Sequence, residues 1–393
     1  MPMHIVAYHG VFKASMWFGQ RRRRESLRIR EGGNEMKPTR MSRMIGPLLT
    51  GVLVVAACTS GATATPSPQA SAAPPSGSAE LPSAAPTEMP GTKEFTVAFT
   101  SLGMSSAPFL AALASLREQG YTIETPVLAE SELVTQGTAS GEFAFGSGAN
   151  NSTLTAIEAG AKLKVLVNRV NNEWTLYARN AITSCEQLDG MRLAIHSEGA
   201  VSTAMVKNYV ESTCPGTEPT YLVIPGSPAR LAALLADQID ASPLELTDAV
   251  TVDLEAADRF SLLTSLSKDL PELQTTSIYV NGDFAAENPG TVYAVVKAVL
   301  EQFRAIDGDA ALLEKIAREH VGDALDLDTI GDAAAKYVEL SMFPVDGGLT
   351  KENLEYSAKF FGPEGTGAST TVIPVDQFAD LSFLEMALDE LGS

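Results

Sequence analysis

The sequence predicts a two-lobed α/β protein whose sheets are rich in parallel strands and carry helices on both faces. Three observations lead to this prediction. From Phe95 onward about 300 residues have a composition able to fold, which is enough for two lobes. Strand-like and helix-like segments alternate there, and that order favours parallel sheets. The alternation forms two series, and segments 173–179 and 274–281 are interpreted as two crossing strands that act as a hinge.

The first series begins with residues 95–100, whose β-branched and aromatic side chains predict a strand. A helix is expected over 105–119, because Ser105 and Ser106 suit its start, Pro108 suits its first turn, and apolar side chains recur on one face. The elements expected next are strand 121–124, helix 131–139, strand 143–145, helix 152–159 and strand 162–169.

The second series repeats this pattern, and a mainly helical region follows from residue 289. The expected elements are strand 191–196, helix 201–212, strand 220–223, helix 229–236, strand 239–241, a helix from 244, and helices 292–306, 310–320, 327–340 and 351–360. We assign 94–178 with 276–393 to lobe I and 179–275 to lobe II. Open α/β sheets bind ligands outside the carboxyl ends of their strands, so the cleft between the lobes is the expected site.

A hydrophobic stretch from Met44 to Ala57 lies between Arg40 and Arg43 on one side and Cys58 on the other. It is too short to span a bilayer, which needs roughly 20 residues. The order is that of a bacterial lipoprotein signal, which predicts cleavage before Cys58, acylation of its thiol and a lipid anchor on the cell membrane. The alternative is a plain signal peptide or a membrane helix with an incidental cysteine.

Residues 1–57 form this signal region. Residues 1–35 do not suit the basic N-terminal part of a signal peptide, so we infer that the start codon has been assigned too early. Residues 58–93 hold the anchored cysteine and a Pro/Ser/Ala-rich linker that is expected to be disordered. The whole chain has 28 basic and 48 acidic residues; residues 1–57 hold ten and three of these. The remainder has a net charge of −27, which disfavours nucleic acid and anionic lipid as partners.

Cys185 and Cys214 are the two remaining cysteines, and they flank the expected strand 191–196 and helix 201–212. A helix returning antiparallel to its strand brings the two positions together, which predicts a disulfide in an oxidising compartment. Two unpaired thiols are the alternative. The sequence shows no zinc-like Cys/His spacing, so neither a metal nor a cofactor is expected.

Several segments resemble one family when they are taken in order. These are 139–146 (Ala-Ser-Gly-Glu-Phe-Ala-Phe-Gly), 159–165 (Ala-Gly-Ala-Lys-Leu-Lys-Val), 188–194 (Leu-Asp-Gly-Met-Arg-Leu-Ala), 231–241 (Leu-Ala-Ala-Leu-Leu-Ala-Asp-Gln-Ile-Asp-Ala), Asn288-Pro289 and 375–392. They resemble the substrate-binding proteins of ABC importers in the nitrate/sulfonate/taurine group, over about residues 95–392. The resemblance implies a periplasmic-binding-protein type II fold that closes on a small solute. Ala144 and Asp237 depart from the family's Asp and Gly, which leaves the solute open.

Candidate ligand contacts lie mainly in segments that follow strands. They are Ser101, Gly103, Met104 and Ser105 after the first strand, Ser147, Gly148, Asn150 and Asn151 after the third, and Ser197, Gly199, Ser202 and Thr203 in lobe II. Backbone N–H groups at a helix start hold anionic or polar groups. Ordinary capped turns are the alternative for these loops.

Two further candidates stand beside the crossings. Trp174 suits either a stacking wall for the ligand or packing between the lobes. Glu245 suits either an acceptor for an amine or ring N–H, or a solvated carboxylate at a helix start. Because basic residues are few in the expected cleft loops, we favour a neutral or amine-bearing solute, including zwitterions and pyrimidine precursors, over a bare anion.

The expected function is that of a lipid-anchored, extracytoplasmic and monomeric receptor for a small organic or anionic solute. Its expected partners are that solute and the permease and ATPase of an ABC importer, with the membrane contacted only through the anchor. An anchored sensor without transport is the alternative. The sequence shows no catalytic motif, so no enzyme and no catalytic residue are expected, although relatives on the same fold include enzymes.

Overall fold

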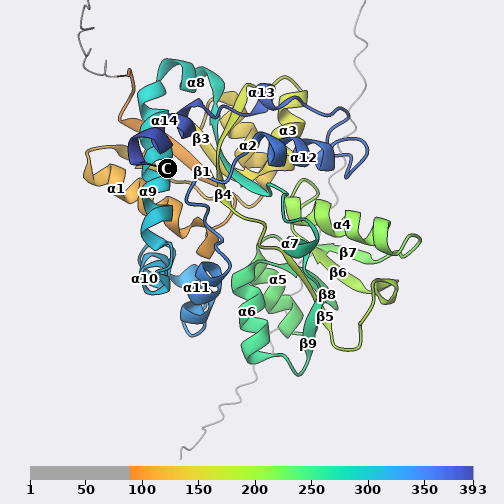
Figure 1. Ribbon diagram of the computed structural model, residues 1–393. Coiled ribbons are helices and arrows are strands. Elements are labelled where there is room, and N and C mark those ends of the chain that lie inside the picture. The colour runs from red at the N-terminus through yellow and green to blue at the C-terminus, as the bar shows by residue number, and fades with distance from the viewer. Residues whose placement is uncertain (1–88, 393) are drawn as a thin grey trace, which may run out of the picture. The chain divides into compact units, whose positions relative to one another are not determined.

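The computed structural model describes residues 89–392 (Figure 1). The expected lipid-modified Cys58 and its signal region lie outside the described residues. Two five-stranded sheets organise the described part of the chain, each with helices packed around it. The predicted two-lobed α/β class is therefore confirmed. We call each sheet with its own helices a lobe.

The sheet of the first lobe has the strand order β2-β1-β3-β10-β4. Its strands are β1 (Glu94–Phe99), β2 (Thr122–Glu124), β3 (Phe145–Ala149), β4 (Leu163–Val170) and β10 (Thr276–Asn281). The strand β1 runs parallel to β2 and β3, whereas β10 is antiparallel to β3 and β4. The helices between its strands are α1 (Ala107–Glu118), α2 (Ser131–Ser140) and α3 (Asn150–Glu158).

The sheet of the second lobe repeats this plan with the order β7-β6-β8-β5-β9. Its strands are β5 (Thr175–Arg179), β6 (Arg192–Ile195), β7 (Thr220–Val223), β8 (Ala241–Leu244) and β9 (Phe260–Thr264). Its helices are α4 (Val201–Thr213), α5 (Ser227–Leu235), α6 (Leu246–Glu255) and α7 (Leu266–Asp269). Here β5 is the antiparallel strand beside β8. The chain crosses between the lobes at 171–174 and 270–275, each time just before the antiparallel strand.

A series of helices completes the chain. These are α8 (Gly282–Glu287), α9 (Pro289–Ile306), α10 (Ala310–His320), α11 (Ile330–Glu339), α12 (Lys351–Phe361), α13 (Val375–Phe378) and α14 (Ser382–Leu391). The long helix α9 packs against α1 and α14, and α11 packs against α6 of the second lobe (Figure 1). Within residues 89–392, no helix combines the length and the apolar character that crossing a membrane requires.

The strand β3 differs most from the expectation. Its predicted range was 143–145, with a glycine-rich loop after it, but the strand continues to Ala149 and α3 begins at once. Gly146 looked like a loop residue because glycine weakens strands. The ring of Tyr279, on the neighbouring strand β10, covers Gly146 so closely that any Cβ there would overlap it. The strand β9 and the helix α7 were not predicted.

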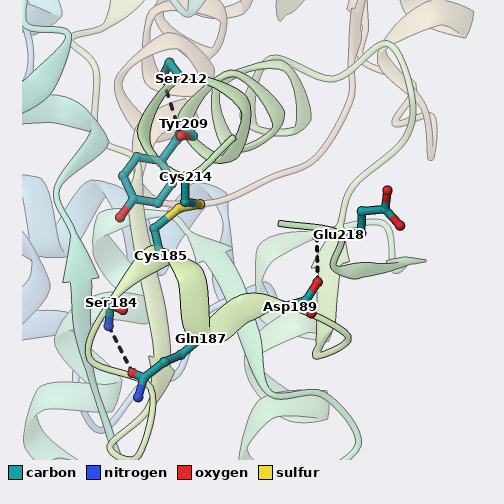
Figure 2. The surroundings of a disulfide bond; sticks show 8 residues. All are labelled: Ser184, Cys185, Gln187, Asp189, Tyr209, Ser212, Cys214 and Glu218. Carbon is teal, nitrogen blue, oxygen red and sulfur yellow. Dashed lines mark hydrogen bonds between the residues drawn. A yellow bond between two sulfur atoms is a disulfide. The ribbon is translucent and has the colours of Figure 1, made fainter. Parts of the chain in front are cut away.

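Cys185 and Cys214 form a disulfide bond in the structure, with their Cα atoms 5.8 Å apart (Figure 2). Cys185 begins a 3-10 helix that precedes β6, and Cys214 directly follows α4. Both side chains are buried. The bond therefore joins the start of the strand segment to the end of the helix that returns beside it.

Asp237, which stands where the family has glycine, has the left-handed backbone angle φ 58°. Glycine adopts this region readily and other residues do so under strain. Its carboxylate accepts from Arg179 Nη1 at 2.6 Å and lies 2.9 Å from Arg259 Nη2. These two arginines hold the pKa of Asp237 below its ordinary value. The ion pairs explain how an aspartate is kept at this glycine-like position.

Candidate functional site

The lobes meet through hydrogen bonds at one edge of the cleft. Glu132, in the first turn of α2, accepts from Ser197 Oγ at 3.1 Å and from the Gly199 N–H at 2.7 Å. Asn151 Nδ2 and Ser152 Oγ, on α3, donate to the Gly199 carbonyl at 2.9 and 2.6 Å. We call these five residues the lobe contact. The Glu132 carboxylate lies just before α4, near the exposed N–H groups of a helix start, which favour negative charge.

His196 adds a further contact between the lobes. Its Nε2 lies 3.1 Å from the Ala129 carbonyl, and its Nδ1 accepts from the Gly226 N–H at 3.1 Å. Since Nδ1 accepts, Nε2 carries the proton and donates to Ala129. Burial, with the Arg230 guanidinium nearby, lowers the pKa of His196 to about 4. The imidazole is therefore neutral at pH 7.

Arg169 is the penultimate residue of β4 and only 4% exposed. Its Nη1 donates to Ser147 Oγ at 3.2 Å, and its Nη2 donates to Ser105 Oγ at 3.3 Å. Its Nε has no hydrogen-bond partner among the described residues. A buried guanidinium with an unpartnered N–H is costly unless a ligand or a water molecule completes it.

Glu173 follows Arg169 on the crossing segment and is also buried. The hydroxyl of Tyr337, on α11, donates to its Oε2. Burial, together with the charge of Glu245, raises the pKa of Glu173 to about 8. The carboxyl group is therefore largely protonated at pH 7, so it adds little negative charge beside Arg169.

Arg230, on α5, brings a second guanidinium from the other lobe, and its side chain is fully buried at 0% exposure. Its Nε donates to the Pro243 carbonyl at 3.0 Å and its Nη1 to the Ile224 carbonyl at 3.3 Å. Its Nη2 has no partner among the described residues. The guanidinium carbon lies 5.7 Å from the centre of the Trp174 ring, a cation–π distance.

Glu245 directly follows β8 as the N-cap residue of α6, and it is half-buried. Within the described residues its carboxylate makes no hydrogen bond or ion pair, although its backbone N–H donates to Ser227 Oγ at 2.9 Å. A Cβ at Gly103, on the first lobe, would lie 3.2 Å from Glu245 Oε2. Burial raises the pKa of Glu245, and the charges of Arg169 and Arg230 oppose that rise.

Asp248 lies in the first turn of α6 and is buried. Burial, with the charge of Glu245, raises the pKa of Asp248 to about 7. We call the five ionisable side chains between the lobes the charged cluster: Arg169, Glu173, Arg230, Glu245 and Asp248. Among residues 89–392, no group of His, Cys, Asp and Glu side chains is arranged to hold a metal ion.

The sequence-predicted site residues lie in three different places in the structure. Glu245 belongs to the charged cluster, and four other predicted residues lie against members of it: Gly103, Ser105, Ser147 and Trp174. The lobe contact includes Asn151, Ser197 and Gly199. Asn150 donates to the Gln274 carbonyl at 2.7 Å, and its Oδ1 has no partner among the described residues.

The remaining predicted residues do not enter either group. Met104 is fully buried in the hydrophobic core, and Ser101 is half-buried in the loop after β1. Gly148 lies against the Tyr279 hydroxyl, to which a Cβ would approach within 3.2 Å. Ser202 and Thr203 are buried in the first turn of α4, where Thr203 Oγ1 accepts from the His196 N–H.

The sequence reasoning missed Glu132, Arg169 and Tyr337. The expectation that the cleft is poor in basic groups is wrong in one respect, because Arg169 adds a second buried guanidinium. A signal for it existed, since an arginine near the end of an otherwise apolar strand needs a buried partner or a ligand. Glu198, in the segment between β6 and α4, is exposed and paired with Lys207 at 2.5 Å.

Comparisons with known proteins agree with this geometry. Residues 116–306 match the family model described as NMT1/THI5 like. No curated protein sequence matches the chain significantly. Many solved structures share its fold. The periplasmic nitrate-binding protein of Synechocystis PCC 6803 is 13% identical, with a TM-score of 0.61 over 77% of this chain and 90% of that one.

Two further structures give the same result. The putative periplasmic sulfonate-binding protein of Methylobacillus flagellatus KT is 17% identical, with a TM-score of 0.57 over 77% of this chain and 96% of that one. A ligand-binding component of an ABC-type import system from Staphylococcus aureus is 12% identical, with a TM-score of 0.62 over 75% and 99%. Residues 116–306 are thus similar to the NMT1/THI5-like family, and the described part of the chain has the fold of these binding proteins.

Proposed function

We propose that this chain is an extracytoplasmic solute receptor that binds one small polar molecule between its lobes and delivers it to an ABC importer. One observation carries the proposal. Two fully or almost fully buried guanidinium groups, one from each lobe, keep an N–H without a partner among the described residues. Buried donors of this kind are rare unless a ligand or water completes them.

In this proposal, the lobe contact links solute binding to closure of the two lobes. Glu132, Asn151 and Ser152 reach Ser197 and Gly199 only when the lobes approach each other. A solute that touches Arg169 on one lobe and Arg230 on the other stabilises the same approach. Binding therefore shifts the receptor towards the state that has these contacts, which is the form we expect an importer permease to recognise.

The proposed receptor is held on the bacterial membrane through acyl chains on Cys58 and acts as a monomer, with a permease and an ATPase as its partners. Its ligand contacts are the charged cluster and the polar groups around it, with Trp174 as an apolar wall. We propose no catalytic step, because the ionisable groups of the cluster serve to hold charge and hydrogen bonds. A sensor that binds the same solute without transport would use the same site.

Calorimetric titration of the purified full chain, with Tm measured in parallel, tests the proposal. The panel contains nitrate, methanesulfonate, taurine, 2-aminoethanol and an aminomethylpyrimidine. We expect saturable one-to-one binding of one solute, accompanied by a rise in Tm. Absence of heat and of any Tm shift across the panel would contradict a receptor for these classes. Binding without stimulation of an importer ATPase in membranes would favour the sensor.

A further inference from the structure

We propose that Glu245 is a specificity-determining residue: its carboxylate takes the place of an anion between the two buried arginines. It thereby excludes bare anions and selects solutes that present an ammonium or N–H group. This inference rests on the proposed receptor function and names the solute class that the site accepts.

The placement of Glu245 carries the argument. The residue precedes α6 in the second lobe, yet its Oε2 lies so near Gly103 of the first lobe that a Cβ there would be 3.2 Å away. Its carboxylate nevertheless makes no hydrogen bond or ion pair within the described residues, and it is not within 4 Å of any described basic group. A carboxylate that reaches across the cleft without a partner is an acceptor directed at a third molecule.

Charge balance points to the same solute class. The positive groups of the cluster are Arg169 and Arg230, and each has an unpartnered N–H. The charges of both arginines act on Glu245, and Asp248 adds a carboxyl group beside Arg230. When Glu245 and Asp248 are both ionised, two carboxylates offset the two guanidinium charges and leave no excess positive charge for an added anion. A solute that donates a hydrogen bond to Glu245 and offers neutral acceptors to the two arginines gives each of these three side chains a partner.

The lobe contact also places a glutamate carboxylate of this chain where an anion would be attracted. The carboxylate of Glu132 lies against Ser197 and Gly199, just before α4, and supplies negative charge near the start of that helix. At both anion-attracting places in the cleft, a glutamate of the chain itself supplies the negative charge. Gly103 has a matching role, because a Cβ there would lie 3.2 Å from Glu245 Oε2 and would push the carboxylate aside by a few tenths of an ångström.

The test compares the full chain with Glu245→Gln, which keeps the shape of the side chain and removes its charge. At pH 8 we expect the wild type to bind neither nitrate nor methanesulfonate, and to bind at least one amine or aminopyrimidine of the panel. In Glu245→Gln we expect affinity for nitrate or methanesulfonate to rise at least tenfold and affinity for the amine to fall at least tenfold. Glu255→Gln, an exposed change at the end of the same helix, controls for net charge and should change neither affinity.

The outcomes separate this inference from the proposed function. Tight binding of nitrate or methanesulfonate by the wild type overturns the inference and leaves the receptor function intact. The same holds if a folded Glu245→Gln, with wild-type Tm, gains no anion affinity while the wild type binds an amine. If neither protein binds any member of the panel, both proposals are rejected. Gly103→Ala serves as a second variant, and it should weaken amine binding without a gain in anion affinity.

Discussion

The lobe contact and the charged cluster both join the two lobes, but they do so in opposite ways. In the lobe contact, carboxylate, amide and hydroxyl groups bond to each other across the cleft at 2.6–3.1 Å. In the charged cluster, Arg169 and Arg230 keep unpartnered N–H groups, and Glu245 has no partner within the described residues. In the proposed receptor, different residues therefore close the lobes and recognise the solute, so a substitution can affect one of these roles without the other.

The largest expected effect on solute affinity comes from a substitution in the charged cluster. Arg169→Met removes a buried guanidinium and should weaken the binding of whichever solute the wild type binds by about 100-fold. A hydrogen bond from a charged donor contributes about 1.5–3 kcal/mol, and 1.4 kcal/mol is a factor of ten. Calorimetric titration measures the change, and Tm shows whether the variant folds. Arg169→Lys keeps the charge and should retain more affinity. Wild-type affinity in a folded Arg169→Met would show that the cluster does not bind the solute.

Removal of the disulfide should lower stability and leave the lobe contact and the charged cluster unchanged. Replacement of Cys185 and Cys214 by serine opens a loop with a sequence separation of 29 residues. The loss of that constraint should lower the free energy of unfolding by about 3 kcal/mol. Denaturant unfolding measures it, with reduced wild-type protein as the control. A loss of solute affinity at unchanged stability would show that the disulfide shapes the site rather than the scaffold.

Glu132→Ala should weaken solute binding at least tenfold, mainly through faster dissociation. The variant loses two hydrogen bonds to a charged acceptor, and these form only when the lobes meet; one such bond contributes about 1.5 kcal/mol. Stopped-flow dissociation measures the effect. Glu130→Ala, an exposed change two residues away, is the matched control. Equal effects of the two substitutions would mean that the lobe contact does not hold the liganded state.

Stability should fall as pH rises from about 6.5 to 8. In this window the native state keeps a proton on Glu173, whose pKa is raised to about 8, whereas the unfolded chain has lost it. The native state thus binds more protons, and each such proton lowers stability by up to about 1.4 kcal/mol per pH unit. The raised pKa of Asp248 acts in the same direction up to its value of about 7.

Unfolding at several pH values measures this trend, and Glu173→Gln should flatten it. His196, with its lowered pKa of about 4, acts in the opposite direction, but only between about pH 4 and 6.5. Stability that rises with pH above 6.5 would contradict a protonated Glu173. The charged and titratable groups that face this region are Arg169, Glu173, His196, Arg230, Glu245, Asp248 and Tyr337.

The sequence predicted most elements because local patterns encode them. Helix 310–320 and strand 220–223 were placed at their observed bounds, since each has turn residues at its ends and a regular apolar pattern. The strand β3 was cut short because its glycines suit a loop equally well. Only the ring of Tyr279, more than 100 residues further along the chain, explains why glycines occur inside that strand.

Residue types and their periodicity by themselves predicted a two-lobed α/β protein, which the structure confirms, and placed the expected site between the lobes. Tertiary structure alone decided which polar groups meet there. Glu132 and Gly199 are 67 residues apart, and no local signal links them. The physical reason is that strand and helix formation depend on near neighbours, whereas the partners of a buried charge are fixed only when distant strands and helices pack together.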